Sequence, residues 1–144
     1  MFRLKRAWLI HIVALTISNL AFGQLSEVAT DSGTYRGHIS PIDERVTVFQ
    51  GIGYAAPPVG DLRWKPPSPA IPFAGVREAD RVSAACWQAR NSDASVYARG
   101  NLNRSEDCLY LNVFTGADGS DADLPVMVWF HGGGNTAGHG GPLI

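Results

Sequence analysis

An uninterrupted apolar run from Leu124 to Phe130 leads directly into His131 and three consecutive glycines. Half-buried strands alternate apolar and polar side chains, whereas a run without alternation is typical of a strand covered on both faces. Such strands lie at the centre of a sheet with helices on either side. The run therefore predicts a central strand of an α/β sheet.

Three further strands are expected before this run. Gly33–Ile39 and Arg45–Ile52 are rich in β-branched and aromatic residues, and the Ser-Pro-Ile-Asp sequence between them signals a turn. They are expected to form an antiparallel hairpin or meander. Cys108–Gly116 alternates aliphatic with aromatic side chains and is expected to be a strand. Together the elements predict a β-meander followed by the first central strands of an α/β sheet.

The stretch Ala56–Pro72 is too rich in proline to form a helix, because proline lacks an N–H and clashes with the preceding turn. It is predicted to be an extended, ordered loop. Phe73–Asn103 is mixed in composition and is predicted to be loop with at most one helical turn. No repeat or second domain is visible.

The first 23 residues have the layout of a secretory signal. Arg3, Lys5 and Arg6 precede a mainly apolar stretch, and Ala21 and Gly23 form a small-residue cleavage pattern before Gln24. A permanent membrane anchor is the alternative, but polar residues interrupt the apolar stretch. We expect residues 1–23 to be removed, residues 24–144 to form the mature chain without a stable membrane anchor, and the protein to be secreted or periplasmic.

The sequence has two cysteines, Cys86 and Cys108. In an oxidising compartment a disulfide between them is favoured over two buried free thiols. The sequence has no C-x-x-C motif and its histidines are not clustered beside the cysteines, so no metal site is expected. Asn103 begins an Asn-Arg-Ser sequence, which is a glycosylation acceptor if the source is eukaryotic.

The charge distribution excludes two classes of partner. The formal net charge is −1, and no run of like charges occurs. A groove for nucleic acid or a patch for anionic membranes would need clustered basic residues.

One glycine motif has the spacing of a dinucleotide-binding loop without its context. Gly51–Ala56 matches G-x-G-x-x-A, but that loop must lead into a helix whose N-terminus binds the pyrophosphate. Pro57 and Pro58 forbid such a helix, so no nucleotide cofactor, and no other cofactor, is expected.

The glycines after His131 have two functional interpretations besides a flexible turn. A phosphate-binding P-loop would require lysine and serine or threonine after the last glycine, and Gly-Gly-Gly-Asn-Thr-Ala-Gly has no lysine. An oxyanion hole uses two backbone N–H groups to stabilise the negative oxygen of a tetrahedral acyl intermediate. A strand followed by His-Gly-Gly-Gly is the form found in lipases and esterases.

Three segments together resemble one family. FQGIGYAAPPVGDLRW, SEDCLYLNVFTG and LPVMVWFHGGGNTAG are similar to the N-terminal portion of the type B carboxylesterases, the α/β hydrolases that include cholinesterases and para-nitrobenzyl esterases. The likeness extends over roughly residues 33–138 and implies the α/β-hydrolase fold.

The resemblance also implies roles for individual residues. Gly133 and Gly134 match the glycines whose N–H groups supply most of the oxyanion hole. Cys86 and Cys108 match the family's first disulfide, and Arg63 and Glu106 match a structural salt bridge. Asn135 stands where the family commonly has an aromatic residue, which predicts a wider or more polar acyl pocket.

No catalytic triad is expected within the printed sequence. Such an esterase needs a serine in G-x-S-x-G, followed by Asp or Glu and then His, and none of the serines has this context. We expect all three residues to lie beyond Ile144, so that the chain is an inactive fragment carrying only the oxyanion loop of an enzyme for small-molecule esters. The alternative parent is a cholinesterase-like adhesion or binding domain that lacks catalysis.

Overall fold

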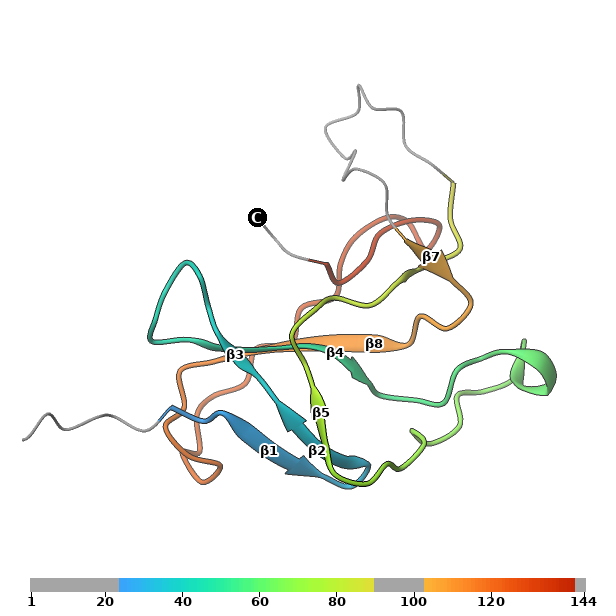
Figure 1. Cartoon of the computed structure of the whole chain (residues 1–144). Coiled ribbons are helices and arrows are strands. Elements are labelled where there is room, and N and C mark those ends of the chain that lie inside the picture. The colour runs from blue at the N-terminus through green and yellow to red at the C-terminus, as the bar shows by residue number, and fades with distance from the viewer. Residues whose placement is uncertain (1–23, 90–102, 142–144) are drawn as a thin grey trace, which may run out of the picture.

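The computed structural model describes residues 24–89 and 103–141 (Figure 1). These residues form short strands joined by long loops, and the single helix among them is a 3₁₀ turn, η1 (Gly60–Leu62). The predicted signal segment, residues 1–23, lies outside the described residues. None of the helices in the described part has the length and apolar character needed to cross a bilayer.

The first sheet has the order β1-β2-β5. β1 (Glu27–Thr30) pairs antiparallel with β2 (Gly33–Arg36), and β2 pairs in parallel with β5 (Val76–Glu78). Arg36 stands between two carboxylates on the neighbouring strands, Glu27 at 2.7 Å and Glu78 at 2.6 Å, and all three side chains are exposed. Such cross-strand pairs stabilise the register modestly.

The second sheet has the order β3-β4-β8, and β8 is its last strand before the glycines in the sequence. β3 (His38–Ile39) and β4 (Thr47–Gly53) form the expected antiparallel hairpin, but only these two residues of the predicted strand Gly33–Ile39 take part, because Gly33–Arg36 belongs to β2 in the first sheet. β4 also pairs antiparallel with β8 (Tyr110–Thr115). A bulge interrupts β4 between Phe49 and Ile52. A third, two-stranded sheet joins β6 (Ala85–Cys86) to β7 (Arg104–Ser105) in parallel.

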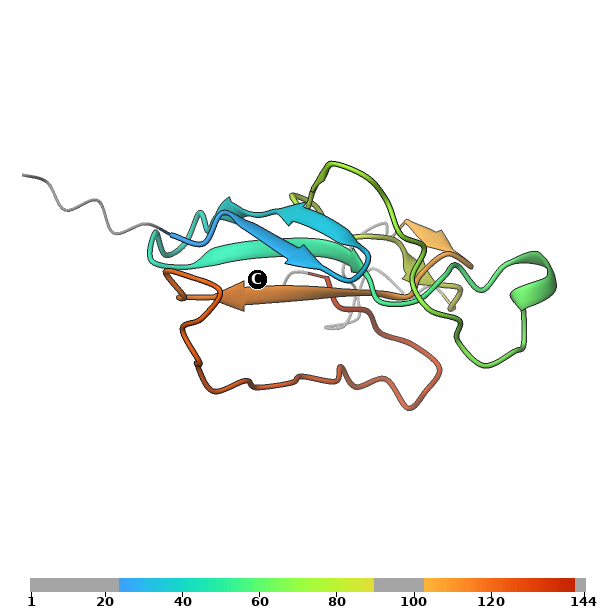
Figure 2. The same ribbon diagram turned by 90° about the horizontal axis from the view of Figure 1, so that it is seen from below.

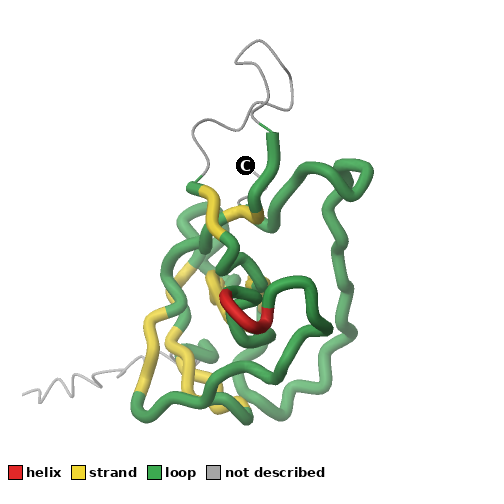
Figure 3. Tube along the Cα trace, turned by 90° about the vertical axis from the view of Figure 1, so that its right-hand side faces the viewer, coloured by secondary structure: helices red, strands yellow, loops and turns green. Residues whose placement is uncertain are grey.

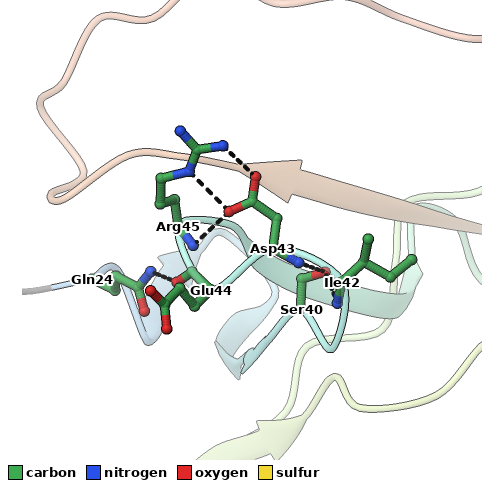
Figure 4. A network of polar contacts seen from close by, with 6 residues as sticks. All are labelled: Gln24, Ser40, Ile42, Asp43, Glu44 and Arg45. Atoms are coloured by element: carbon green, nitrogen blue, oxygen red, sulfur yellow. Dashed lines mark hydrogen bonds and ion pairs between the residues drawn. The ribbon is translucent and has the colours of Figure 1, made fainter.

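The turn between β3 and β4 is closed by short-range polar contacts (Figure 4). Arg45 holds Asp43 with Nε at 2.9 Å and Nη2 at 2.7 Å, and its backbone N–H donates to the same carboxylate. The side-chain hydrogen bond from Arg45 is the main reason that the pKa of Asp43 falls to about 2. The Ser40 hydroxyl accepts the N–H of Ile42, and Gln24 reaches the Glu44 carbonyl. The Ser-Pro-Ile-Asp sequence thus forms the predicted turn.

The core lies where the first two sheets meet. In Figure 2, β1 and β2 lie on one side of β4 and β8. Tyr35 from β2, Phe49 from β4 and Ala79 are almost fully buried, and Phe73 meets the Tyr35 ring edge-on with centroids 5.1 Å apart. Burying these side chains supplies the main driving force for folding the described part.

Two local predictions need correction. The proline-dense loop contains η1, because residues 59–65 between its proline clusters are free of proline. The described part of Phe73–Asn103 contains β5 and β6 but no helical turn. The remainder of that stretch lies outside the described residues.

The predicted strand Leu124–Phe130 is not formed. These residues pair with no described strand, and the side chains of Val126, Met127 and Phe130 are 86–90% exposed. Figure 2 shows the segment as an arc that runs below β8 without joining it. A buried strand needs hydrogen-bonded neighbours and covering layers, and the described residues supply neither. The sequence pattern is therefore that of a central strand, but this structure leaves the segment unpaired.

Candidate functional site

The glycine loop, residues 131–141, turns through three successive residues with positive φ. Gly133 has φ 133°, Gly134 φ 59° and Asn135 φ 58°. Glycine adopts such angles without a Cβ penalty, and asparagine tolerates the left-handed region better than most residues. The Gly-Gly-Asn sequence therefore permits a turn that an aromatic residue at position 135 would make more strained.

The turn is closed on the carbonyl oxygen of Gly133. This oxygen accepts the backbone N–H groups of Thr136 at 3.0 Å and Ala137 at 3.1 Å, and also the Thr136 hydroxyl at 3.1 Å. A Cβ on Gly133 would overlap the Ala137 carbonyl oxygen. Residue 133 thus has to be glycine for the turn to close in this way.

The N–H groups of Gly133 and Gly134 make no hydrogen bond to any residue that the structure describes. No Asp, Glu, Lys or Arg occurs between His131 and Gly141, so no charged side chain of the loop itself competes for them. Two neighbouring N–H donors without acceptors are chemically suited to bind an anionic oxygen. The predicted pair, Gly133 and Gly134, therefore retains its donors in this conformation.

His131 contacts its own loop. Its Nδ1 lies 2.9 Å from the Gly132 carbonyl oxygen, and its ring lies against Gly138. These contacts suit a side chain that braces the loop.

Two carboxamides that the sequence did not single out tie the loop to the rest of the molecule. Gln88 makes two hydrogen bonds with the backbone of Gly138. Asn112 on β8 donates to the Gly140 carbonyl and accepts the N–H of Gly51, at 2.9 Å, from the β4 bulge. Neither contact has a sequence signal, because the partners lie far apart along the chain.

The predicted cross-links meet just before β8. Cys86 and Cys108 form a disulfide with sulfur atoms 2.05 Å apart. Arg63 and Glu106 form an ion pair with Nε 2.6 Å from Oε1, and their side chains are 55% and 37% exposed. An ion pair this exposed contributes less than about 1 kcal/mol. The disulfide is the stronger of the two constraints on the segment that leads into β8.

A cavity of about 160 Å³ lies between the disulfide segment and the glycine loop. It is lined by residues of both segments: Cys86, Trp87, Gln88, His131, Asn135, Ala137 and Gly138. Trp87 is 67% exposed. The glycine loop and the disulfide segment therefore border the same small space.

A second cavity, of about 200 Å³, is lined by residues that include Tyr35, Arg77 and Tyr110. Burial, and then the hydrogen bond to Asp107, raise the pKa of Tyr110 to about 12. This tyrosine is therefore a neutral hydrogen-bonding group at ordinary pH. Within the described ranges, no group of three or more His, Cys, Asp or Glu residues is placed to hold a metal ion.

The spatial arrangement is shown by the trace in Figure 3, in which η1 is the one red segment and loops dominate. Residues 24–142 match the carboxylesterase family, and the chain belongs to that family.

Several characterised relatives are similar over this region. The chain is 42% identical to a cocaine esterase of Oryctolagus cuniculus over 118 residues, covering 76% of this chain and 22% of that protein. It is 41% identical to a fumonisin B1 esterase of Sphingopyxis macrogoltabida, covering 74% and 19%. It is 40% identical to an acetylcholinesterase of Gallus gallus, covering 78% and 16%. The chain thus spans about a fifth of the length of these relatives.

Solved structures agree with the family assignment. A PNB esterase superposes with a TM-score of 0.67 at 38% sequence identity, over 81% of this chain and 22% of that one. A thermophilic PNB esterase gives the same TM-score and identity, over 23% of its own chain. The α/β-hydrolase prediction is confirmed in part, because the matched region is a partial fold whose described regular elements, apart from η1, are all strands.

Proposed function

We propose that this chain supplies the oxyanion-binding part of a serine carboxylesterase that hydrolyses small-molecule carboxylic esters. One observation carries the proposal: the N–H groups of Gly133 and Gly134 lack acceptors among the described residues, in a loop of a carboxylesterase-family chain. The chemistry is acyl transfer from the ester to a serine and then to water.

The role of the loop follows from the charge that develops in this reaction. When the serine oxygen attacks the ester carbonyl carbon, the carbonyl oxygen becomes an oxyanion. Preorganised N–H groups at 2.7–3.1 Å stabilise that oxygen more than the uncharged carbonyl, and so lower the barrier. Histidine takes the serine proton and returns it to the leaving alcohol, and an acidic residue orients the histidine.

The printed sequence lacks a G-x-S-x-G serine, so we expect it to have no esterase activity by itself. Purified chain should hydrolyse p-nitrophenyl acetate no faster than a heat-treated sample of the same chain. A fusion is expected to be active: residues 24–141 of this chain in place of the matching 22% of the PNB esterase. Serine-dependent turnover by the isolated chain would contradict the first expectation.

The fusion also separates this proposal from its main alternative. A chain from a non-catalytic, adhesive relative would be free to lose the oxyanion geometry, and its fusion would fold without activity. The matched control is the unaltered PNB esterase. A folded fusion with no more activity than its serine-to-alanine variant would reject the proposed function.

We further propose that the protein is secreted or periplasmic. The Cys86–Cys108 disulfide supports this location, because disulfides persist mainly in oxidising compartments.

A further inference from the structure

We propose that Gln88 is a positioning residue whose carboxamide holds the glycine loop in the conformation that presents the Gly133 and Gly134 N–H groups. The inference deepens the proposed function and rests on it for one claim, that these N–H groups bind an oxyanion. The geometry of the contact stands independently, in the hydrogen bonds that the Gln88 side chain makes.

The Gln88 carboxamide pairs with the backbone of Gly138 in both directions. Its Nε2 donates to the Gly138 carbonyl at 2.9 Å, and its Oε1 accepts the Gly138 N–H at 2.8 Å. Nε2 also donates to the Cys86 carbonyl at 3.1 Å. A flipped amide would face N–H against N–H and oxygen against oxygen, so the surroundings specify one orientation.

Gly138 lies directly after the turn that closes on the Gly133 carbonyl oxygen. Thr136 and Ala137 both donate to the Gly133 carbonyl, and Gly138 is the next residue along the chain. Fixing both polar groups of Gly138 therefore fixes the base of the turn, while the Gly133 and Gly134 N–H groups stay unengaged among the described residues. Asn112 donates to the Gly140 carbonyl two residues further on, so the loop is attached at two residues, Gly138 and Gly140.

Gln88 is itself anchored by contacts of its own segment. Cys86, two residues before it, pairs with Ser105 between β6 and β7 and is bonded covalently to Cys108. Arg104 Nη1 donates to the Gln88 carbonyl at 2.9 Å. A positioning side chain must have less freedom than the loop it positions, and these contacts meet that condition.

The first test measures hydrogen exchange at Gly138 in the whole chain by NMR. Gln88→Met keeps the length of the side chain but removes the donor and the acceptor. We expect the Gly138 amide to exchange at least about tenfold faster, because its acceptor is lost. Gln24→Met is the matched control, since it removes a side-chain-to-backbone bond at an exposed site far along the chain. Unchanged exchange at Gly138 in Gln88→Met would overturn the proposal.

A second variant guards against simple unfolding. In Gln88→Glu an ionised carboxylate still accepts the Gly138 N–H but places its other oxygen against two carbonyls, whereas a protonated carboxyl donates there as the amide does. The protection factor of Gly138 should therefore approach the native value near or below about pH 4, the ordinary range of glutamate, and fall toward neutral pH. A protection factor that does not respond to pH would contradict the pairing described here.

The third readout separates this inference from the proposed function. In the esterase fusion, Gln88→Met is expected to lower kcat about tenfold and to change KM less than twofold, because a displaced loop weakens transition-state binding. An active fusion with an unchanged kcat would reject the role of Gln88 and leave the proposed function standing. An inactive, folded fusion together with faster Gly138 exchange would reject the proposed function and leave the Gly138 contact standing.

Discussion

Gly133→Ala is expected to lower kcat of the esterase fusion by about 100- to 1000-fold, the range seen when one oxyanion donor is lost. The new Cβ would overlap the Ala137 carbonyl oxygen, and φ at this position is 133°, which alanine rarely adopts. The turn must open to relieve both, and that moves the Gly133 and Gly134 N–H groups away from the substrate oxygen. Steady-state kinetics with p-nitrophenyl acetate measure the loss.

Gly132→Ala is the matched control for this prediction. It introduces the same methyl group one residue earlier, where no described atom beyond the adjoining residues lies within 4 Å of the new Cβ and φ is outside the left-handed region. We expect it to keep most of the activity. Equal losses in the two variants would indicate a general sensitivity of the loop and would contradict the specific role given to Gly133.

Removing the disulfide with Cys86→Ser and Cys108→Ser together is expected to destabilise the chain by about 3 kcal/mol. The bond closes a loop with a sequence separation of 22, and cross-links of this span act mainly by restricting the unfolded chain. Urea unfolding followed by tryptophan fluorescence measures the change in the free energy of unfolding. The Gly138 amide should also exchange faster, because Gln88 loses part of its support.

The control for the disulfide is the effect of a reducing agent. Dithiothreitol should destabilise the native chain by about the same amount and leave the double serine variant unchanged. A native chain with the same unfolding midpoint before and after complete reduction would show that the cross-link adds nothing to stability.

Local signals in the sequence predict the parts of the fold that depend on neighbouring residues. The Ser-Pro-Ile-Asp turn joins the β3–β4 hairpin, and the alternating stretch from Cys108 forms β8. The pairing of β4 with β8 and the short strand β1 were not predicted. Strand pairing over such a separation depends on contacts that no local pattern encodes.

The apolar run from Leu124 shows the limit of patterning. Its composition indicates a strand buried on both faces, yet a strand exists only with a hydrogen-bonded neighbour. In the described structure the run has none, and its side chains stay exposed. An apolar run therefore indicates that a segment needs strand neighbours and covering layers. It does not show that the described residues supply them.

The candidate site likewise contains residues that the sequence identifies and residues that it does not. The glycines and His131 are recognisable because they are contiguous and glycine permits unusual backbone angles. Gln88 and Asn112 reach the loop across separations of 50 and 28 residues, and neither residue type is rare or patterned. Only the structure brings these two carboxamides to the glycine loop.

The most direct test of the oxyanion assignment is a crystal structure of the esterase fusion with its serine bound covalently to a phosphonate ester. The phosphoryl oxygen of that adduct mimics the oxyanion of the tetrahedral intermediate. We expect it to lie 2.7–3.1 Å from the backbone nitrogens of both Gly133 and Gly134. An oxygen held by other donors, with these two N–H groups turned away from it, would contradict the assignment.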